Sequence, residues 1–152
     1  MVVRLAVEKA CAVAPEPGTV VLGADTAVVL DGEVFGKPAD RADALRMLAM
    51  LSGRRHQVMT GVAVRAASTA ESVLSVTEVT FRKIAPDEAL DYWQSGEPRG
   101  KAGAYAIQGL GGTFVESIAG SYTGVVGLPV FETAELLRSA GIELPAELKD
   151  AL

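Results

Sequence analysis

The stretch Val20-Val-Leu-Gly-Ala-Asp-Thr-Ala-Val-Val-Leu30 is apolar and rich in β-branched residues, and a single carboxylate interrupts it. This composition predicts a buried strand over residues 19–30. Asp31 and Gly32 follow directly, and this pair is typical of a tight turn that leads into a short second strand at Val34–Phe35. This part of the chain therefore indicates a β-sheet whose first two strands form a hairpin.

Helices and strands alternate along the rest of the chain. Turn residues and apolar periodicity predict helices over residues 2–14, 40–51, 86–95 and 129–140, and strands over 56–64, 73–81 and 113–118. Because the alternation includes hairpins, we expect an α/β or α+β domain with a mixed central β-sheet flanked by helices. No linker or repeat divides the sequence, which predicts a single domain over residues 1–152.

Charge, cysteine content and the length of the apolar runs argue against several classes of protein. The net charge of −5 argues against binding of nucleic acid through a basic face, although a few lysines can still hold a small phosphate locally. Cys11 is the one cysteine, which excludes an intrachain disulfide framework and fits a reducing compartment. The longest apolar run, residues 20–30, is too short to span a bilayer. We therefore expect a cytoplasmic protein with no nucleic-acid or membrane partner.

Asp25 is the most informative single residue. An ionised carboxylate among valines and leucines is costly unless it is paired or bound to a cation, so such a residue is often part of a site. The alternative is a structural aspartate that bonds to the backbone or caps a turn, and Asp25 alone leaves the two interpretations evenly matched. Gly23 favours a site, because glycine permits close approach to the backbone.

Three further residues are candidates for ligand contacts. Lys37 lies on a rigid loop between a glycine and a proline, and Lys101 is flanked by small residues that leave room for a ligand. Gln108 is an amide in an apolar setting, where a buried donor and acceptor suit the reading of a base edge. The alternatives are solvated loop lysines and a glutamine bonded within the core. For His56 a structural role is favoured over metal ligation.

Six segments follow one another in a recognisable order. They are Val2-Val-Arg-Leu-Ala6 with Glu8-Lys9-Ala10, Val21-Leu-Gly-Ala-Asp-Thr26, Gly36-Lys-Pro38, the segment from Met47-Leu to Thr60, the segment from Gly96-Glu-Pro to Gly109, and the segment from Gly120-Ser-Tyr to Pro129. Taken together they resemble the Maf family of nucleoside triphosphate pyrophosphatases, with the family's order and spacing from about residue 2 to residue 140. Each motif alone is weak, but six in register are specific.

The resemblance implies a Maf/ITPase-like α/β architecture and an enzyme that hydrolyses a nucleoside triphosphate to the monophosphate and pyrophosphate. A divalent cation, Mg²⁺ or Mn²⁺, would assist the reaction. Asp25 would be the general base or a metal ligand, and the lysines would face the phosphates. At the positions where family branches differ, this chain resembles the branch that acts on dTTP, UTP and modified pyrimidine nucleotides. The substrate-binding residues so implied are Lys9, Lys37, Lys101, Thr26 and Gln108.

One departure from the family pattern concerns its first motif. Family members have an N-terminal strand and a Ser-x-Ser-Pro-Arg-Arg phosphate loop, and the 152 residues contain neither. We therefore expect either a start placed at an internal codon or a shortened chain that binds triphosphates poorly. The alternative function is a catalytically impaired nucleotide-binding protein or an interaction protein linked to cell division. A homodimer is left open.

Overall fold

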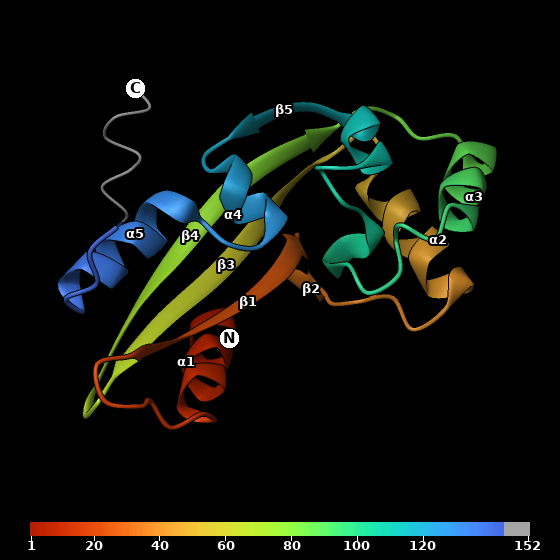
Figure 1. Ribbon diagram of the computed structural model, residues 1–152. Helices are drawn as coiled ribbons and strands as arrows, with labels where there is room; N and C mark the ends of the chain where they lie inside the picture. The colour runs from red at the N-terminus through yellow and green to blue at the C-terminus, as the bar shows by residue number, and fades with distance from the viewer. Residues whose placement is uncertain (145–152) are drawn as a thin grey trace.

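Five strands form one sheet in the order β2-β1-β3-β4-β5, as the computed structural model in Figure 1 shows. The structure describes residues 1–144. The strands are β1 (Val20–Leu30), β2 (Glu33–Phe35), β3 (Arg55–Ala66), β4 (Thr69–Phe81) and β5 (Val115–Ala119). The helices are α1 (Val2–Cys11), α2 (Arg41–Leu51), α3 (Pro86–Gln94), α4 (Tyr122–Val126) and α5 (Val130–Ser139), with short 3₁₀ helices η1 (Ala102–Ala104) and η2 (Leu110–Phe114).

The hairpins follow from local sequence. Asp31 and Gly32 have φ values of 50° and 82°, so the predicted turn between β1 and β2 is confirmed. The β3–β4 hairpin is longer than predicted, because Ala66 pairs with Thr69 at its tip. The small and polar residues near that tip weaken the apolar pattern, but they leave the backbone free to continue the pairing.

The predicted α/β class, with a central sheet flanked by helices, is confirmed. The sheet differs from the predicted mixed sheet in one respect, since all four pairings within residues 1–144 are antiparallel. Parallel neighbours need a crossover that returns the chain to the far end of the sheet. Here β2 and α2 lead from the end of β1 into β3 at the same end, where Val29 pairs with Gln57. The strand β3 therefore runs opposite to β1.

Helix α1 packs closely against one face of β1 and β3. A Cβ atom at Gly23 would lie 2.3 Å from the carbonyl oxygen of Ala6, and one at Gly61 would lie 2.6 Å from the carbonyl carbon of Val2. Both glycines are thus needed for the helix to reach the sheet. The close approach that Gly23 permits is that of a helix and not of a ligand, which corrects the sequence interpretation. The buried cluster of this contact consists of small residues: Ala6, Ala10 and Ala63.

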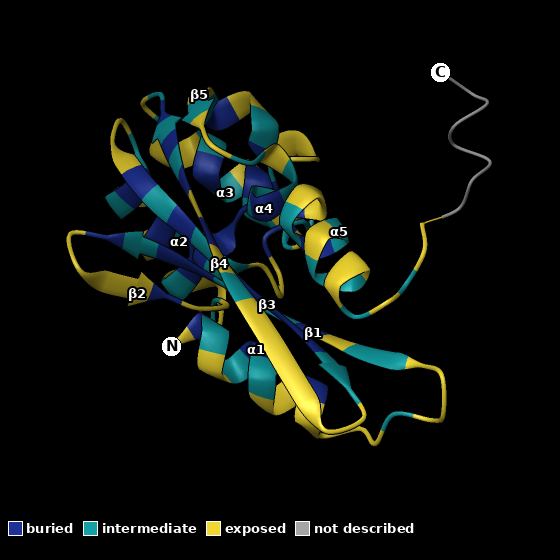
Figure 2. Cartoon of the chain, turned by 90° about the vertical axis from the view of Figure 1, so that its left-hand side faces the viewer, coloured by how far each residue is buried: buried dark blue, intermediate teal, exposed yellow. Residues whose placement is uncertain are grey.

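A larger, aromatic core lies where α2 and α3 pack beyond the end of β1 (Figure 1). His56 belongs to it, with 2% of its surface exposed and its ring centroid 4.8 Å from that of Phe81. Its Nε2 lies 2.9 Å from the hydroxyl oxygen of Tyr105, so the predicted structural role is confirmed. Burial lowers the pKa of His56 to about 4. Figure 2 shows the contrast with the opposite end of β4, which is exposed.

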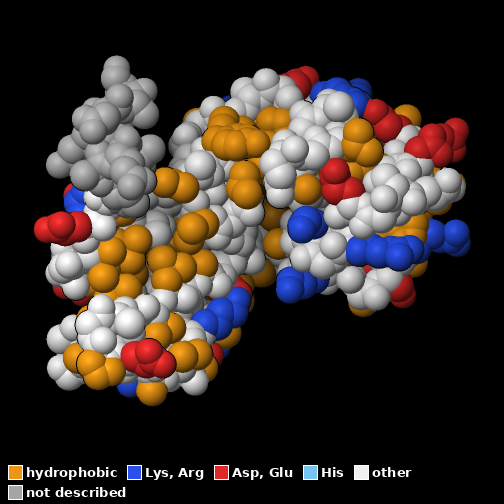
Figure 3. Space-filling view, in the orientation of Figure 1, with side chains coloured by type: hydrophobic (Ala, Val, Ile, Leu, Met, Phe, Trp, Pro, Cys, Tyr) orange, Lys and Arg blue, Asp and Glu red, His pale blue; other side chains and the backbone are white. Residues whose placement is uncertain are grey.

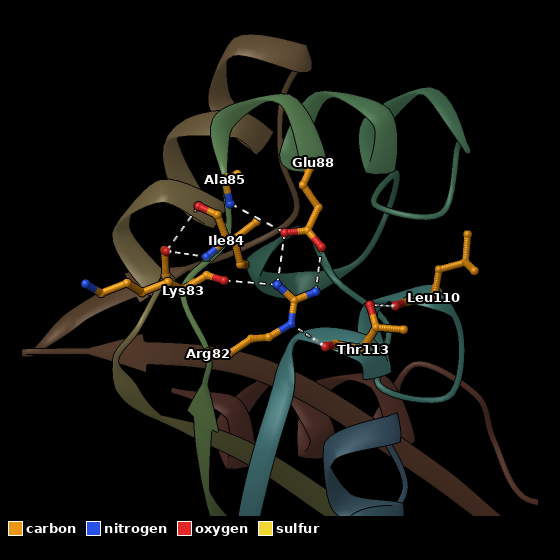
Figure 4. Close-up of polar contacts among 8 residues, drawn as sticks. Arg82, Lys83, Ile84, Ala85, Glu88, Leu110 and Thr113 are labelled. Atoms are coloured by element: carbon orange, nitrogen blue, oxygen red, sulfur yellow. Dashed lines mark hydrogen bonds and ion pairs between the residues drawn. The ribbon is translucent and has the colours of Figure 1, made fainter.

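Arg82 joins the end of β4 to α3 and η2 (Figure 4). Its Nε donates to the carbonyl oxygen of Thr113 at 2.7 Å, and its Nη1 donates to that of Lys83 at 2.9 Å. The two Nη atoms also donate to the carboxylate of Glu88, at 2.9 and 2.5 Å. These hydrogen bonds hold the pKa of Glu88 below its ordinary value. One guanidinium thus fixes the position of η2 relative to the sheet.

Both cores lie against the same sheet. Residues 145–152 lie outside the described residues, so the single domain over residues 1–152 stays a prediction. Of the helices within residues 1–144, none has the length and apolar character that a membrane crossing requires.

Candidate active site

A cleft of about 520 Å³ opens beside the edge of β1. Within the described part of the chain, β2 pairs only with residues 28–30, so residues 20–27 of β1 have a strand neighbour only on the β3 side. Figure 3 shows Lys and Arg side chains on both sides of a hollow beside α1. The structure brings all six predicted site residues to this cleft: Lys9, Asp25, Thr26, Lys37, Lys101 and Gln108.

Asp25 and Lys9 form an ion pair inside the cleft. Lys9 Nζ donates to Asp25 Oδ1 at 2.7 Å and to the carbonyl oxygen of Ala24 at 2.9 Å. The Asp25 side chain is only 21% exposed, so this cation satisfies the carboxylate where water reaches it poorly. The second oxygen, Oδ2, accepts no hydrogen bond from residues 1–144. One carboxylate oxygen is therefore oriented by Lys9 while the other stays available.

Lys37 and Lys101 enter the cleft from the other side. Their loops are joined, because the backbone N–H of Gly103 donates to the carbonyl oxygen of Gly36 at 3.1 Å. Both side chains belong to exposed residues, and neither lysine forms an ion pair with any described residue. They lie across the cleft from the ion pair of Lys9 with Asp25, and they can meet an anionic ligand.

Gln108 lies exposed on a turn, whereas the sequence interpretation placed it in an apolar setting. The N–H of Gly109 donates to the carbonyl oxygen of Ala106 at 3.2 Å and closes this turn. Water reaches the amide, so it needs no protein partner, and it makes no hydrogen bond within residues 1–144. Its donor and acceptor both remain available to a ligand.

Glu97 holds the segment that carries Gln108, a role that the sequence analysis did not predict. Its carboxylate accepts hydrogen bonds from the backbone N–H groups of Leu110 and Gly111, each at 2.9 Å, and from the Tyr92 hydroxyl at 2.5 Å. Burial acts to raise the pKa of Glu97, but these hydrogen bonds outweigh burial and lower the pKa. Its place in the Gly96-Glu-Pro motif was the one available sequence signal.

Two further hydroxyl groups, which the sequence analysis did not single out, lie at the cleft or behind its wall. Thr60, which is 1% exposed, lies behind Thr26, with 2.9 Å between their Oγ1 atoms. Tyr105 is buried, lines the cleft and bonds to His56, and burial raises the pKa of its phenol. Only strand alternation could have placed Thr60 on the same face as Thr26. No local pattern reports the contact between Tyr105 and His56.

The residues that line the cleft can be compared with the ligands that a divalent cation needs. No group of three His, Cys, Asp or Glu side chains that could hold a metal ion occurs within residues 1–144. Among residues 1–144, Asp25 is the one carboxylate that lines the cleft. Because Mg²⁺ is commonly held by one or two carboxylates together with the phosphates of its substrate, the residues present fit a cation shared with a nucleotide.

Three lysines and one carboxylate of the described residues line this cleft, and clustered cations of this kind attract anionic ligands. The chain belongs to the Maf family, since the sequence profile described as Maf-like protein matches residues 1–140. The resemblance inferred from the six motifs is thereby confirmed.

Similar proteins carry the name dTTP/UTP pyrophosphatase. The one from Bordetella parapertussis (strain 12822) is 60% identical over 129 residues, which are 85% of this chain and 62% of that protein. The one from Bordetella avium (strain 197N) is 56% identical over 129 residues, with 85% and 64% covered. The one from Anaeromyxobacter dehalogenans (strain 2CP-C) is 57% identical over 150 residues, with 96% and 76% covered. The chain thus spans less than two thirds of the length of the Bordetella relatives it matches.

Proposed function

We propose that this protein hydrolyses dTTP, UTP or a modified pyrimidine nucleotide to the monophosphate and pyrophosphate, with Mg²⁺ or Mn²⁺. The observation that carries the proposal is the gathering of Lys9, Lys37 and Lys101 around Asp25 in one cleft. The three relatives named dTTP/UTP pyrophosphatase support the substrate class.

The lysines bind and orient the triphosphate. Lys37 and Lys101 form no ion pair among the described residues, so their charges can be directed to phosphoryl oxygens. Lys9 has two of its three N–H bonds engaged by Asp25 and Ala24, which leaves one for the ligand. Fixed cations stabilise the negative charge that spreads over phosphoryl oxygens in the transition state.

Asp25 activates the water. Its free Oδ2 accepts a proton from water, the water oxygen bonds to phosphorus, the α–β phosphoanhydride bond breaks and pyrophosphate leaves. The contact from Lys9 to Oδ1 fixes the orientation of the carboxylate during this step. A divalent cation held by Asp25 and the phosphates would add neutralising charge. Thr26 and Gln108 face the nucleoside, where short polar groups can pair with a pyrimidine edge.

The test is pyrophosphate release from dTTP and UTP with Mg²⁺ or Mn²⁺. Asp25→Asn keeps the shape of the side chain but removes the base, so kcat is expected to fall at least about 100-fold. The matched control is Asp31→Asn. Asp31 directly follows β1 and lies in the exposed turn, where it is paired with Arg54. Its rate is expected to stay within about twofold of the parent, because exposed ion pairs contribute little.

An unchanged rate in Asp25→Asn would contradict the role of Asp25. Nucleotide affinity without turnover in the parent protein would favour the alternative, a nucleotide-binding protein without catalysis. A cytoplasmic location is also proposed, which suits the free and exposed thiol of Cys11. A homodimer stays a prediction that a sedimentation measurement can test.

A further inference from the structure

We propose that Thr60 fixes the hydroxyl of Thr26 so that Thr26 presents a hydrogen-bond acceptor to the cleft, and that this acceptor selects uracil and thymine over cytosine. Thr60 is then a positioning residue, and Thr26 is the group that reads the base. The inference rests on the proposed function, because it assumes that the cleft holds a pyrimidine nucleotide.

The direction of the hydrogen bonds follows from proton counting. Thr60 Oγ1 lies 2.8 Å from the carbonyl oxygen of Gly124, and a carbonyl oxygen can only accept. The single hydroxyl proton of Thr60 is therefore committed to Gly124. Thr26 Oγ1 lies 2.9 Å from Thr60 Oγ1, so Thr26 must be the donor in that contact. Its own proton points inward, and its lone pairs are left for the cleft.

The surroundings keep this arrangement in place. Thr60 is 1% exposed, so water does not compete for its hydroxyl. The acceptor of its proton, Gly124, belongs to α4, where its N–H is in turn held by the Ser121 side chain at 3.0 Å. Thr26 itself lines the cleft, and its hydroxyl has no second partner within residues 1–144.

Gly127 leaves the Thr26 hydroxyl uncovered. It has a φ of 127°, and the nearest atom that a Cβ there would meet is Thr26 Oγ1, at 3.7 Å. A glycine at this point places no side chain beside the hydroxyl. An incoming base can therefore approach the lone pairs of Thr26.

An acceptor of fixed direction distinguishes the pyrimidines at one atom. Uracil and thymine carry an N–H donor at N3, whereas cytosine carries an unprotonated nitrogen there, which is an acceptor. Thr26 can bond to the first and would leave two facing acceptors with the second, and such a mismatch is strongly disfavoured in a desolvated site. A freely rotating hydroxyl would accommodate both bases. The buried contact with Thr60 is what makes the site selective.

The experiment compares kcat/KM for UTP and CTP in the parent and in threonine variants. Thr60→Val removes the hydroxyl but keeps the shape, so the ratio of UTP to CTP is expected to fall by about tenfold. Thr60→Ser restores the hydroxyl, and its ratio is expected to lie within about twofold of the parent. Thr26→Val should lower the ratio as Thr60→Val does, and Thr26→Ser should preserve it. The double variant should lower it no further than Thr26→Val alone.

Affinities for UTP and CTP, measured by titration calorimetry with Mg²⁺, give a second UTP-to-CTP ratio that does not depend on turnover, and the same changes are expected in it. Pyrophosphate release thus decides the proposed function, while the ratio decides the role of Thr60. A ratio that stays unchanged in both valine variants, or shifts toward UTP, would overturn the inference. So would a Thr60→Ser variant that loses the preference as fully as Thr60→Val, since packing alone would then explain the effect.

Discussion

The two halves of the sheet are held by different kinds of packing. Beyond the end of β1, large side chains such as Phe81 and Phe114 interlock with α2 and α3. At the other half, α1 lies on the sheet only because glycine and alanine place almost nothing between the backbones. The cleft takes Lys37 and Lys101 from the first half and the ion pair of α1 with β1 from the second. The site thus depends both on the aromatic core and on the close packing of α1 against glycine and alanine.

Loss of a large side chain from the aromatic core is the most damaging change we expect. Phe81 is 1% exposed and contacts His56, Tyr105 and Phe114 through edge-to-face ring pairs. Phe81→Ala should lower the free energy of unfolding by about 3–5 kcal/mol, because it leaves a cavity. Phe131→Ala is the control, since that ring is 75% exposed. Urea titration should show a change of less than about 0.5 kcal/mol for the control, and equal effects would contradict the contrast.

The second largest effect that we expect is a loss of stability in acid, caused by His56 in the aromatic core. Burial lowers the pKa of His56 from its ordinary 6.5 to about 4, so the unfolded chain binds a proton more readily than the folded one. The contribution is complete above pH 6.5 and is lost as pH falls from 6.5 to 4, by about 1.4 kcal/mol per pH unit and about 3 kcal/mol in total. Urea titrations at pH 7, 6 and 5 should show this slope, and His56→Gln should remove it. Parallel slopes in the two proteins would show that carboxylates alone cause the loss.

The half of the sheet that α1 covers is tested by adding one methyl group. In Gly23→Ala the new Cβ would lie 2.3 Å from the Ala6 carbonyl oxygen, so α1 must shift. We expect a loss of about 1–3 kcal/mol in the free energy of unfolding. Pyrophosphate release should fall as well, because Lys9 moves with the helix. Gly36→Ala adds the same group where no atom lies within 4 Å, and its melting temperature should stay near that of the parent. A stable Gly23→Ala with full activity would refute this account of α1.

Much of the fold was predictable because local chemistry determines it. The turn at Asp31 and Gly32, the helix that begins after Asp40 and the one that begins at Pro86 all appear where the sequence predicts them. Asp40 caps its helix by accepting the N–H of Asp43 at 2.8 Å, which is a contact between near neighbours in the chain. Strand direction was missed, since it depends on where the connection returns, and periodicity does not report this.

The candidate site was predictable as a set of residues but less so as a set of contacts. The six residues lie around one cleft, yet their chemical roles stay predictions. The sequence could not show that Lys9 reaches Asp25, because the contact joins residues 16 positions apart on different elements. The role of Gly23 was misjudged for the same reason. Thr60 was overlooked because a buried threonine on a strand has no distinctive local signal.

The ion pair between Lys9 and Asp25 has a consequence for how a ligand arrives. It pairs Lys9 with the one carboxylate that the described residues bring to the cleft, so these lining side chains keep a net charge of +2 while the whole chain carries −5. The net negative charge of the chain opposes a polyanion in general, whereas Lys37 and Lys101 attract it at the cleft. Such focusing guides diffusional encounter toward the mouth of the cleft, and added salt weakens the guidance because it screens exposed charges.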